Sequence, residues 1–318
     1  MALLTVSGLG VTIGTLAPLD DVSFEARKGE ILGLVGESGS GKSLTAMAVM
    51  GLLGRIGGRV SSGSILFDGQ ELVGLRDSSY RRLRGKRIAL ISQNPMTSLD
   101  PIVRIGAQID QVSRLHLGLS KPAAKARSID LMQQLRIPDA ETLHGAYPHQ
   151  LSGGMKQRIV IAMALAADPD LIIADEPTTA LDVTIQAQII QIMVDLVRAR
   201  DLALMLITHD MGVVAQACDR VVVLYAGRVA ETNTTQAIFA SPRHPYTASL
   251  IGCIPSRDQA EGTLLGIPGT VPGVLNYPKG CRFHPRCGDA MPVCAQKVPP
   301  TTPQPTGSVA CHLLEAVT

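Results

Sequence analysis

The sequence predicts an α/β fold built around an open parallel sheet. An apolar run at residues 31–35 leads into a glycine-rich loop, and an uncharged stretch of helical length follows at residues 44–53. A second apolar run, residues 171–174, ends in two adjacent carboxylates, and a third, residues 202–207, ends two residues before His209. Polar groups at the carboxyl ends of such strands lie where an open parallel sheet binds its ligands.

The composition indicates a globular protein with no strong electrostatic preference for a partner. The chain has 318 residues, enough for about two domains, and 46% of them are hydrophobic, so it can bury a sizeable core. Its 29 basic and 27 acidic residues leave a formal charge of +2. This balance is too even to indicate a nucleic-acid footprint or a polybasic membrane anchor, and we expect no nucleic-acid partner.

Neither an export signal nor a spanning helix is expected. Residues 1–19 carry no charge, which would suit the apolar part of a signal peptide. They lack the basic region that precedes it, however, and are interrupted by three glycines and Pro18. No stretch elsewhere offers the roughly 18 unbroken apolar residues that a membrane helix needs. If the protein works at a membrane, other subunits must therefore supply the spans.

A short antiparallel layer is expected before residue 70. Residues 63–69 form a brief apolar run bounded by glycines, and Asp68-Gly69 is a hairpin signal.

The loop at residues 36–43 reads Gly-Glu-Ser-Gly-Ser-Gly-Lys-Ser and predicts a phosphate site. Glycines let successive backbone N–H groups surround phosphate oxygens, and the following helix directs its positive end at them. Lys42 then reaches the terminal phosphates, and Ser43 binds Mg²⁺. The alternative is a glycine-rich turn that binds nothing. The nucleotide-binding residues expected here are Gly36, Ser38, Gly39, Ser40, Gly41, Lys42 and Ser43.

The carboxylates after the second apolar run suit Mg²⁺-nucleotide chemistry. Asp175 can hold Mg²⁺, directly or through water, while Glu176 can polarise an attacking water. The alternative is that one of the pair only caps the following helix.

Two further candidates are weak when taken alone. Ser152 is a good N-cap for a helix from about Met155 to Ala167, and Gly153 and Gly154 permit close backbone approach, but Ser-Gly-Gly by itself indicates only a helix-capping turn. A lone histidine such as His209 is more often an ordinary polar residue at a strand end.

Taken together, these motifs resemble the ATP-binding cassette (ABC) ATPases. The phosphate loop, Gln93, Leu151–Arg158, Asp175-Glu176, Leu181-Asp182 and His209 occur in that family's order and approximate spacing. The resemblance covers about residues 1–250. It implies a P-loop ATPase cassette with a RecA-like parallel-sheet core, an antiparallel β layer and a helical lobe. It also implies a head-to-tail dimer that encloses two ATP molecules.

The resemblance implies a role for each matching residue. Ser152, Gly153 and Gly154 would contact the γ-phosphate bound by the opposite subunit, and Asp182 would lie at the dimer seam. The implied catalytic residues are Glu176, His209 and Gln93, and the implied Mg²⁺ ligands are Ser43, Gln93 and Asp175.

One feature departs from the family pattern. Many cassettes place an aromatic residue before the phosphate loop to stack on adenine, but residues 9–19 contain none, and Ile13 occupies the matching position. Such stacking is worth about 0.5–1.5 kcal/mol beyond burial, so base recognition would be weakened while phosphate binding remains. The preference for ATP is therefore implied by the family alone.

A small helical lobe is expected at about residues 94–165. About 57 residues separate Gln93 from Leu151, and they include helix-periodic stretches at 102–117 and 123–135. This insertion is too short for the coiled-coil arms of DNA-repair cassettes. In transporters such a lobe receives a coupling helix of the membrane subunit, and we expect that contact to begin at residues 94–101. The alternative is a plain Asn-Pro turn.

We place the nucleotide-binding domain at residues 1–240 and a separate, small and irregular extension at 241–318. Proline and glycine become frequent there, and the spacing of four of the six cysteines is C-x5-C-x6-C-x16-C. Disulfides are disfavoured in a cytosolic protein, whereas four thiolates suit Zn²⁺ or a [4Fe–4S] cluster, and unligated buried thiols are a third reading. The four are Cys281, Cys287, Cys294 and Cys311.

The extension resembles that of ATPase subunits from oligopeptide and dipeptide importers, a group that also includes nickel importers. The matching segments are His244–Thr247, Ile267–Gly269 and Gly280–Cys287. The resemblance favours [4Fe–4S] over zinc at the cysteines. It implies an ATP-hydrolysing subunit that powers the import of peptides as part of an ABC importer and lies at the cytoplasmic face of the bacterial inner membrane.

The implied partners are a second ATPase subunit, more often a paralogue than an identical copy, two transmembrane permease subunits and an extracytoplasmic solute-binding protein. Import of nickel or another small solute is an alternative within the same machine. Outside it, the alternatives are a soluble ABC ATPase that acts on DNA or ribosomes, and a regulatory module with a vestigial ATPase.

Overall fold

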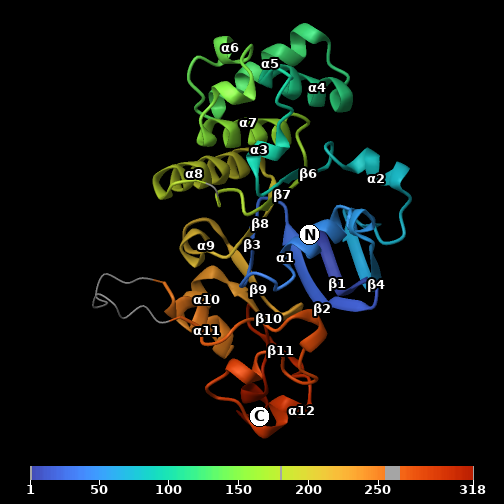
Figure 1. Cartoon of the computed structure of the whole chain (residues 1–318), viewed down its shortest axis with the longest axis vertical. Helices are drawn as coiled ribbons and strands as arrows, with labels where there is room; N and C mark the ends of the chain where they lie inside the picture. Colours follow the sequence, from blue (N-terminus) through green and yellow to red (C-terminus); the bar gives the residue numbers. More distant parts are fainter. Residues whose placement is uncertain (1, 180, 255–265, 318) are drawn as a thin grey trace. The chain divides into compact units, whose positions relative to one another are not determined.

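The computed structural model describes residues 2–179, 181–254 and 266–317. Contacts within the chain group it into two compact units, which we describe separately (Figure 1). Unit 1 comprises residues 1–27, 31–74 and 207–318, and unit 2 comprises residues 28–30 and 75–206. Both units combine strands and helices, and the predicted α/β class is confirmed.

Unit 1 begins with the predicted antiparallel layer. Its strands are β1 (Ala2–Ile13), β2 (Leu16–Arg27), β4 (Gly58–Phe67) and β5 (Gln70–Glu71), in the order β2-β1-β4-β5. The hairpin between β4 and β5 turns at Asp68 and Gly69, both with positive φ, as a tight two-residue hairpin requires.

A second group of strands in unit 1 carries the phosphate loop. These strands follow the order β11-β12-β10-β9-β3, and their bounds are β3 (Ile31–Val35), β9 (Arg220–Tyr225), β10 (Arg228–Thr234), β11 (Thr301–Gln304) and β12 (Gly307–Ala310). Strands β3 and β9 run parallel, with Leu32 opposite Arg220, and the remaining pairs are antiparallel. All five residues of β3 are buried, which explains why its sequence is apolar without alternation.

Part of the cysteine-bearing extension, residues 301–310, continues this sheet. Its strand β12 pairs with β10, with Val309 opposite Glu231. Gly307 is needed there because a Cβ atom would come within 1.8 Å of the Thr232 carbonyl oxygen. The expectation of irregular structure was therefore wrong for residues 301–310.

The helices of unit 1 are short. They are α1 (Lys42–Val49), α9 (Met211–Ala217), α10 (Thr235–Ala240), α11 (Pro245–Gly252) and α12 (Pro292–Gln296), with 3₁₀ turns η1 (Leu53–Ile56), η3 (Val274–Asn276), η4 (His284–Arg286) and η5 (His312–Val317).

Unit 2 contains the strands β6 (Ile88–Ile91), β7 (Leu171–Asp175) and most of β8 (Ala203–Thr208, of which 207 and 208 fall in unit 1), together with most of the long helices. These strands follow the order β8-β7-β6, and Ile88 lies opposite Leu171 in a parallel register. The helices are α2 (Asp77–Leu83), α3 (Pro95–Ser98), α4 (Ile105–Leu117), α5 (Lys121–Gln134), α6 (Ala140–Leu143), α7 (Gly153–Leu165) and α8 (Val183–Arg200), with the 3₁₀ turn η2 (Pro148–Gln150).

Helices α4 and α5 occupy the two stretches for which helical periodicity was predicted, and both pack against α7 (Figure 1). Across residues 2–179, 181–254 and 266–317, the structure contains no helix with both the length and the apolar character needed to cross a membrane.

Candidate nucleotide site

The phosphate loop of unit 1 follows β3 directly and ends where α1 begins. Gly36, Gly39 and Gly41 all have positive φ, at 148°, 82° and 103°. Two of them are also required by close contacts: a Cβ atom on Gly36 would lie 2.2 Å from the Leu224 carbonyl oxygen, and one on Gly41 would lie 2.3 Å from Leu19. Glycine is therefore favoured at these positions because of the backbone conformation and, at Gly36 and Gly41, also because a side chain would collide with its neighbours.

Lys42 closes the loop on itself. Its buried ammonium donates hydrogen bonds to the backbone carbonyls of Gly36 at 2.7 Å and Glu37 at 3.0 Å. These contacts fold the loop around the position where a terminal phosphate is expected. Ser38 and Gly39 are exposed at its tip, whereas Ser40 is fully buried.

The start of α1 suits an anion. Its N-cap is Gly41, which has no side chain, so the first backbone N–H groups of the helix donate no hydrogen bond to a capping side chain. Ser43 lies exposed in this first turn. Together with the positive end of the helix dipole, this arrangement fits the phosphates of ATP and a neighbouring Mg²⁺.

In unit 2 the structure joins two of the predicted catalytic residues. Glu176 follows the last residue of β7, Asp175, and its carboxylate accepts hydrogen bonds from the Gln93 amide at 2.9 Å and the Thr179 hydroxyl at 2.8 Å. Glu176 has a φ of 46°, a left-handed conformation that costs energy for a residue with a side chain. Such strain is typical of functional sites.

The alternative reading of Glu176 as a helix cap does not hold. The helix that follows is α8, and its N-cap is Asp182, whose carboxylate accepts from the Ile185 N–H at 3.0 Å. Asp182 therefore has a structural role in this chain, beside the role at a dimer seam that the family implies.

Ser152 caps α7, as its sequence position predicts. Its hydroxyl accepts a hydrogen bond from the Met155 N–H at 3.3 Å. Gly153 and Gly154 lie inside the first turn, two residues earlier than the expected helix start. A Cβ atom on Gly154 would lie 2.8 Å from Ile185, so this glycine also lets α7 approach α8, a reason that the sequence did not reveal.

His209 follows β8 and is exposed. The next residue, Asp210, caps α9 by accepting from the N–H groups of Gly212 at 2.8 Å and Val213 at 3.3 Å. The histidine is thus held at the end of a buried strand, one residue before a capped helix.

Residues 94–101 form more than an Asn-Pro turn. Asn94 caps the short helix α3 by accepting from the Met96 N–H at 2.8 Å. Met96 is 61% exposed and Ile102 is 82% exposed, while the ammonium of Lys156 lies 3.2 Å from the Met96 sulfur. The segment therefore presents apolar side chains at the surface of unit 2.

The four cysteines of the extension lie near one another. Burial raises the pKa of the Cys311 thiol to about 11, and the other three thiols add to that rise. Burial likewise raises the pKa of Cys281, with smaller contributions from Cys294 and Cys287. Among the residues that the structure describes, no three or more Cys, His, Asp or Glu side chains are placed to hold a metal ion. The prediction of an iron–sulfur cluster thus receives no support from the structure.

Two cysteines, Cys218 and Cys253, lie outside this group. Cys218 is buried, and this burial raises the pKa of its thiol to about 12, as expected for a thiol packed in the core. Cys253 is half-buried.

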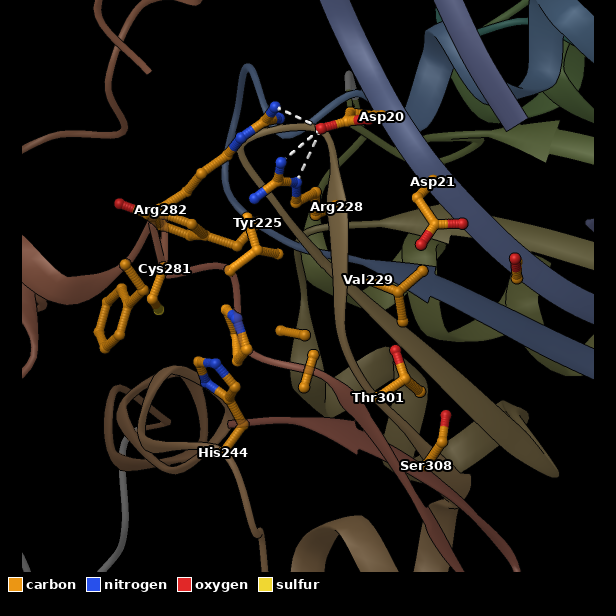
Figure 2. A pocket seen from close by; sticks show the side chains of 16 residues that line it. Asp20, Asp21, Tyr225, Arg228, Val229, His244, Cys281, Arg282, Thr301 and Ser308 are labelled. Atoms are coloured by element: carbon orange, nitrogen blue, oxygen red, sulfur yellow. Dashed lines mark hydrogen bonds and ion pairs between the residues drawn. The ribbon is translucent and has the colours of Figure 1, made fainter. Parts of the chain in front are cut away.

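A cavity of about 400 Å³ lies in unit 1 and is lined in part by the extension (Figure 2). Asp20 of β2 accepts from Arg228 at 3.0 Å and from Arg282 at 3.1 Å on its border. Burial, aided by the nearby Arg228 charge, lowers the pKa of Arg282 to about 10. None of the residues 36–43 lines this cavity, so it is not the nucleotide site.

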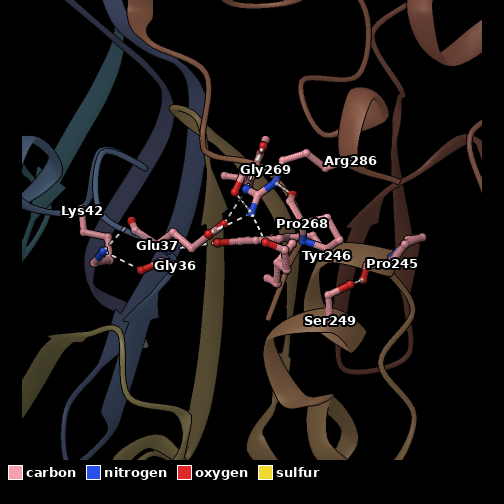
Figure 3. A network of polar contacts seen from close by, with 11 residues as sticks. Gly36, Glu37, Lys42, Pro245, Tyr246, Ser249, Pro268, Gly269 and Arg286 are labelled. Atoms are coloured by element: carbon pink, nitrogen blue, oxygen red, sulfur yellow. Dashed lines mark hydrogen bonds and ion pairs between the residues drawn. The ribbon is translucent and has the colours of Figure 1, made fainter. Parts of the chain in front are cut away.

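The structure also adds three residues that sequence reasoning missed. Glu37, inside the phosphate loop, is hydrogen-bonded to Tyr246 and paired with Arg286 of the extension (Figure 3). These partners lie 209 and 249 residues further along the chain. No local pattern could have indicated such contacts.

Comparison with known proteins agrees with this architecture. Residues 19–179 match the family model of the ABC transporter, and residues 230–294 match that of the oligopeptide/dipeptide transporter C-terminal region. The chain is 47% identical over 303 residues to the dipeptide transport ATP-binding protein DppD of Escherichia coli K12, covering 94% of this chain and 92% of that protein. It is 46% identical over 298 residues to the oligopeptide transport ATP-binding protein AppD of Bacillus subtilis 168, covering 93% and 91%.

Solved structures show the same fold. CbiO1 from Clostridium perfringens, described as part of the ABC transporter complex cbiONQ, matches with a TM-score of 0.65 and 26% identity over 76% of this chain and 91% of that one. The ATP-binding cassette MJ0796 matches with the same TM-score at 24% identity, covering 73% of this chain and 98% of that one. The chain therefore belongs to the ABC transporter family, among the ATP-binding subunits of the oligopeptide/dipeptide group.

Proposed function

We propose that this chain hydrolyses ATP to power the import of peptides through an ABC transporter. The observation that carries the proposal is the similarity to dipeptide and oligopeptide transport subunits, which spans 94% of the chain and includes the extension as well as the cassette. Intact phosphate-loop and carboxylate motifs support an active ATPase rather than a vestigial one. The family comparison likewise favours peptides over nickel as the imported solute.

We carry the roles at the nucleotide over from the motifs of the family. The N–H groups of the phosphate loop and Lys42 bind the phosphates, and Ser43, Gln93 and Asp175 are the residues that would hold Mg²⁺, which screens phosphate charge. Glu176 polarises the attacking water, so that ATP and water give ADP and phosphate. Its hydrogen bond from Gln93 fixes the carboxylate for this task.

The remaining motif residues are assigned to the two nucleotides that the dimer encloses. We propose that Ser152, Gly153 and Gly154 contact the γ-phosphate held by the partner cassette, that Asp182 lies at the seam, and that His209 contacts the γ-phosphate in its own subunit. The support is the capped start of α7, where N–H groups and the helix dipole favour an anion. ATP then favours the closed dimer, because a ligand shifts an equilibrium by its differential affinity for the two states.

The proposed partners are two membrane-spanning permease subunits, a second ATPase subunit that is a paralogue, and an extracytoplasmic solute-binding protein. The chain would lie at the inner face of the bacterial cytoplasmic membrane. We assign the coupling helix of a permease to the surface around Met96 and Ile102, since these exposed apolar side chains gain from being covered.

An iron–sulfur cluster at the four cysteines rests on the family resemblance alone. The thiols lie within electrostatic reach of one another, yet they do not form a metal-binding group among the described residues. No step of ATP hydrolysis depends on it. Equal amounts of iron and acid-labile sulfide in anaerobically purified protein would support the cluster. Stoichiometric zinc in their place would instead show that the four cysteines bind zinc.

The function is tested by purifying the tagged chain from membranes. We expect two permease subunits and a second ATPase subunit to co-purify, and ATP hydrolysis of the reconstituted complex to rise when peptide-loaded binding protein is added. A stable and fully active homodimer without membrane subunits would contradict the proposal.

A further inference from the structure

The extension contacts the phosphate loop at Glu37, the second residue of the loop. The guanidinium of Arg286 forms a two-pronged ion pair with the Glu37 carboxylate, at 2.7 Å and 3.0 Å (Figure 3). The Arg286 side chain is 5% exposed and that of Glu37 is 30% exposed. Paired N–H donors on one carboxylate fix orientation as well as charge, which a single contact does not.

Arg286 is itself held by the extension. Its Nε donates to the Pro268 carbonyl at 2.7 Å and its Nη2 to the Ile267 carbonyl at 3.2 Å, while Nη1 lies 3.3 Å from the Tyr225 hydroxyl. The arginine therefore cannot swing away from Glu37 without breaking several other hydrogen bonds. This makes it a rigid support for the loop.

Tyr246 of α11 provides a second, independent attachment. Its hydroxyl accepts the backbone N–H of Glu37 at 2.9 Å. The ring is fully buried and packs against Tyr225 and Phe283, with ring centres 4.6 Å and 5.2 Å away. Two residues of the extension thus hold the side chain and the backbone of one loop residue.

These contacts lead directly to the phosphate-binding lysine. The Glu37 carbonyl accepts from the Lys42 ammonium at 3.0 Å and from the Ser40 N–H at 3.2 Å. A displacement of Glu37 would therefore move the carbonyl that positions Lys42.

The charge of Glu37 explains why its partner is an arginine. A carboxylate within a loop that binds polyphosphate is electrostatically unfavourable, because like charges repel at short range. Arg286 neutralises that carboxylate and keeps it on the side of the loop that faces the extension.

We propose that Arg286 and Tyr246 are positioning residues of the nucleotide site, through which the extension sets the conformation of the phosphate loop and hence the affinity for ATP. The inference rests on the proposed role of this loop in binding ATP. It gives the extension a function inside its own subunit.

The test measures the affinity of the purified full chain for a fluorescent ATP analogue with Mg²⁺. Arg286→Gln should weaken binding about tenfold, because a hydrogen-bonded charge pair is lost while the Glu37 carboxylate stays. The double variant E37Q/R286Q should recover part of that affinity, since the unpaired charge is gone. Arg243→Gln, which removes an exposed charge from the same extension, is the matched control and should bind normally.

Two further measurements distinguish a positioning role of Arg286 and Tyr246 from a general effect on the stability of the fold. In the assembled transporter, Arg286→Gln should raise KM for ATP while kcat changes less than about twofold, because the loop binds ground state and transition state alike. Tyr246→Phe removes a single oxygen from a packed ring and should weaken ATP binding several-fold, even if Arg286→Gln fails to fold.

Lys42→Ala separates failure of this inference from failure of the proposed function. If Lys42→Ala still binds ATP normally, the assignment of this loop as the phosphate site is wrong. If Lys42→Ala abolishes binding while Arg286→Gln and Tyr246→Phe bind ATP like the unmodified chain, the positioning role is overturned. Loss of ATP affinity that merely follows the unfolded fraction, as read from melting curves, would also overturn it.

Discussion

Glu176 combines a strained backbone with two hydrogen bonds to its carboxylate. A left-handed φ costs on the order of 1–3 kcal/mol for a residue with a side chain, and it persists only where the surroundings enforce it. Here Gln93 and Thr179 both donate to the carboxylate. The side chain is therefore oriented before any nucleotide arrives.

Replacing Glu176 with Gln should leave ATP binding intact and slow hydrolysis by a factor on the order of 100 or more, because the attacking water loses its polarising carboxylate. Phosphate release and retention of bound ATP would be measured together. Glu141→Gln, which alters an exposed carboxylate in the same unit, serves as the control and should hydrolyse normally. Near-normal turnover of Glu176→Gln would remove this residue from the mechanism.

At the scale of elements, several helices start at residues that carry or flank the proposed site. Ser152 caps α7, Asp182 caps α8, and Asp210, next to His209, caps α9. Each of these capping residues therefore begins a helix and also belongs to the proposed site or lies next to one of its residues. Substituting Ser152 or Asp182 would therefore change helix stability as well as any contact with nucleotide.

Helix α11 begins with a cap that depends on pH. The Nδ1 atom of buried His244 accepts the Tyr246 N–H at 3.0 Å, which requires the neutral ring, and burial lowers the pKa of His244 to about 4. The backbone N–H of His244 is anchored in turn on the Glu231 carboxylate at 2.9 Å.

Acidification should therefore destabilise this part of unit 1. The pKa of His244 is lower in the folded chain than its ordinary value of 6.5, so the unfolded chain binds more protons between pH 6.5 and 4. Its contribution to stability is complete above pH 6.5 and falls as the pH falls, by about 2 kcal/mol between pH 7 and 5.

Melting temperatures measured between pH 7.5 and 5 would show this effect. His244→Asn keeps an oxygen that can cap Tyr246 but cannot titrate, so its melting temperature should depend less on pH than that of the unmodified chain. Equal slopes for the two proteins would contradict the assignment.

At the scale of the whole molecule, the apolar surface around α3 should decide whether the chain joins a transporter. Met96→Glu places a charge on the proposed docking surface and should reduce recovery of permease subunits without changing ATP binding. Leu115→Glu changes another exposed apolar residue of the same unit, 74% exposed against 61% for Met96, and is the matched control. Unchanged recovery with Met96→Glu would rule out this surface as the docking site.

The sequence predicted the local units of the fold well. The run at 31–35, the loop after it, the antiparallel layer and the helices at 105–117 and 121–134 all follow from periodicity and turn residues over short windows. The glycines of the phosphate loop could also be predicted, because their conformational requirement is local.

Contacts between distant segments could not be predicted in this way. Arg286 and Tyr246 reach Glu37 across more than two hundred residues, and β12 finds β10 from a region without clear periodicity. Gly154 was assigned to nucleotide approach, while its contact with Ile185 depends on how two helices pack. Such pairings depend on tertiary structure that a single sequence does not display.

The pairing of β12 with β10 has a consequence for solubility. An open strand edge with free N–H and C=O groups can pair with the same edge of another molecule and seed aggregation. In this chain that side of β10 is covered by β12, and β12 is covered in turn by the short strand β11, which contains Pro303. A proline cannot donate to a neighbouring strand, so the sheet ends in an edge that resists further growth. The segment that carries the cysteines therefore also covers a strand edge at which copies of the chain could otherwise aggregate.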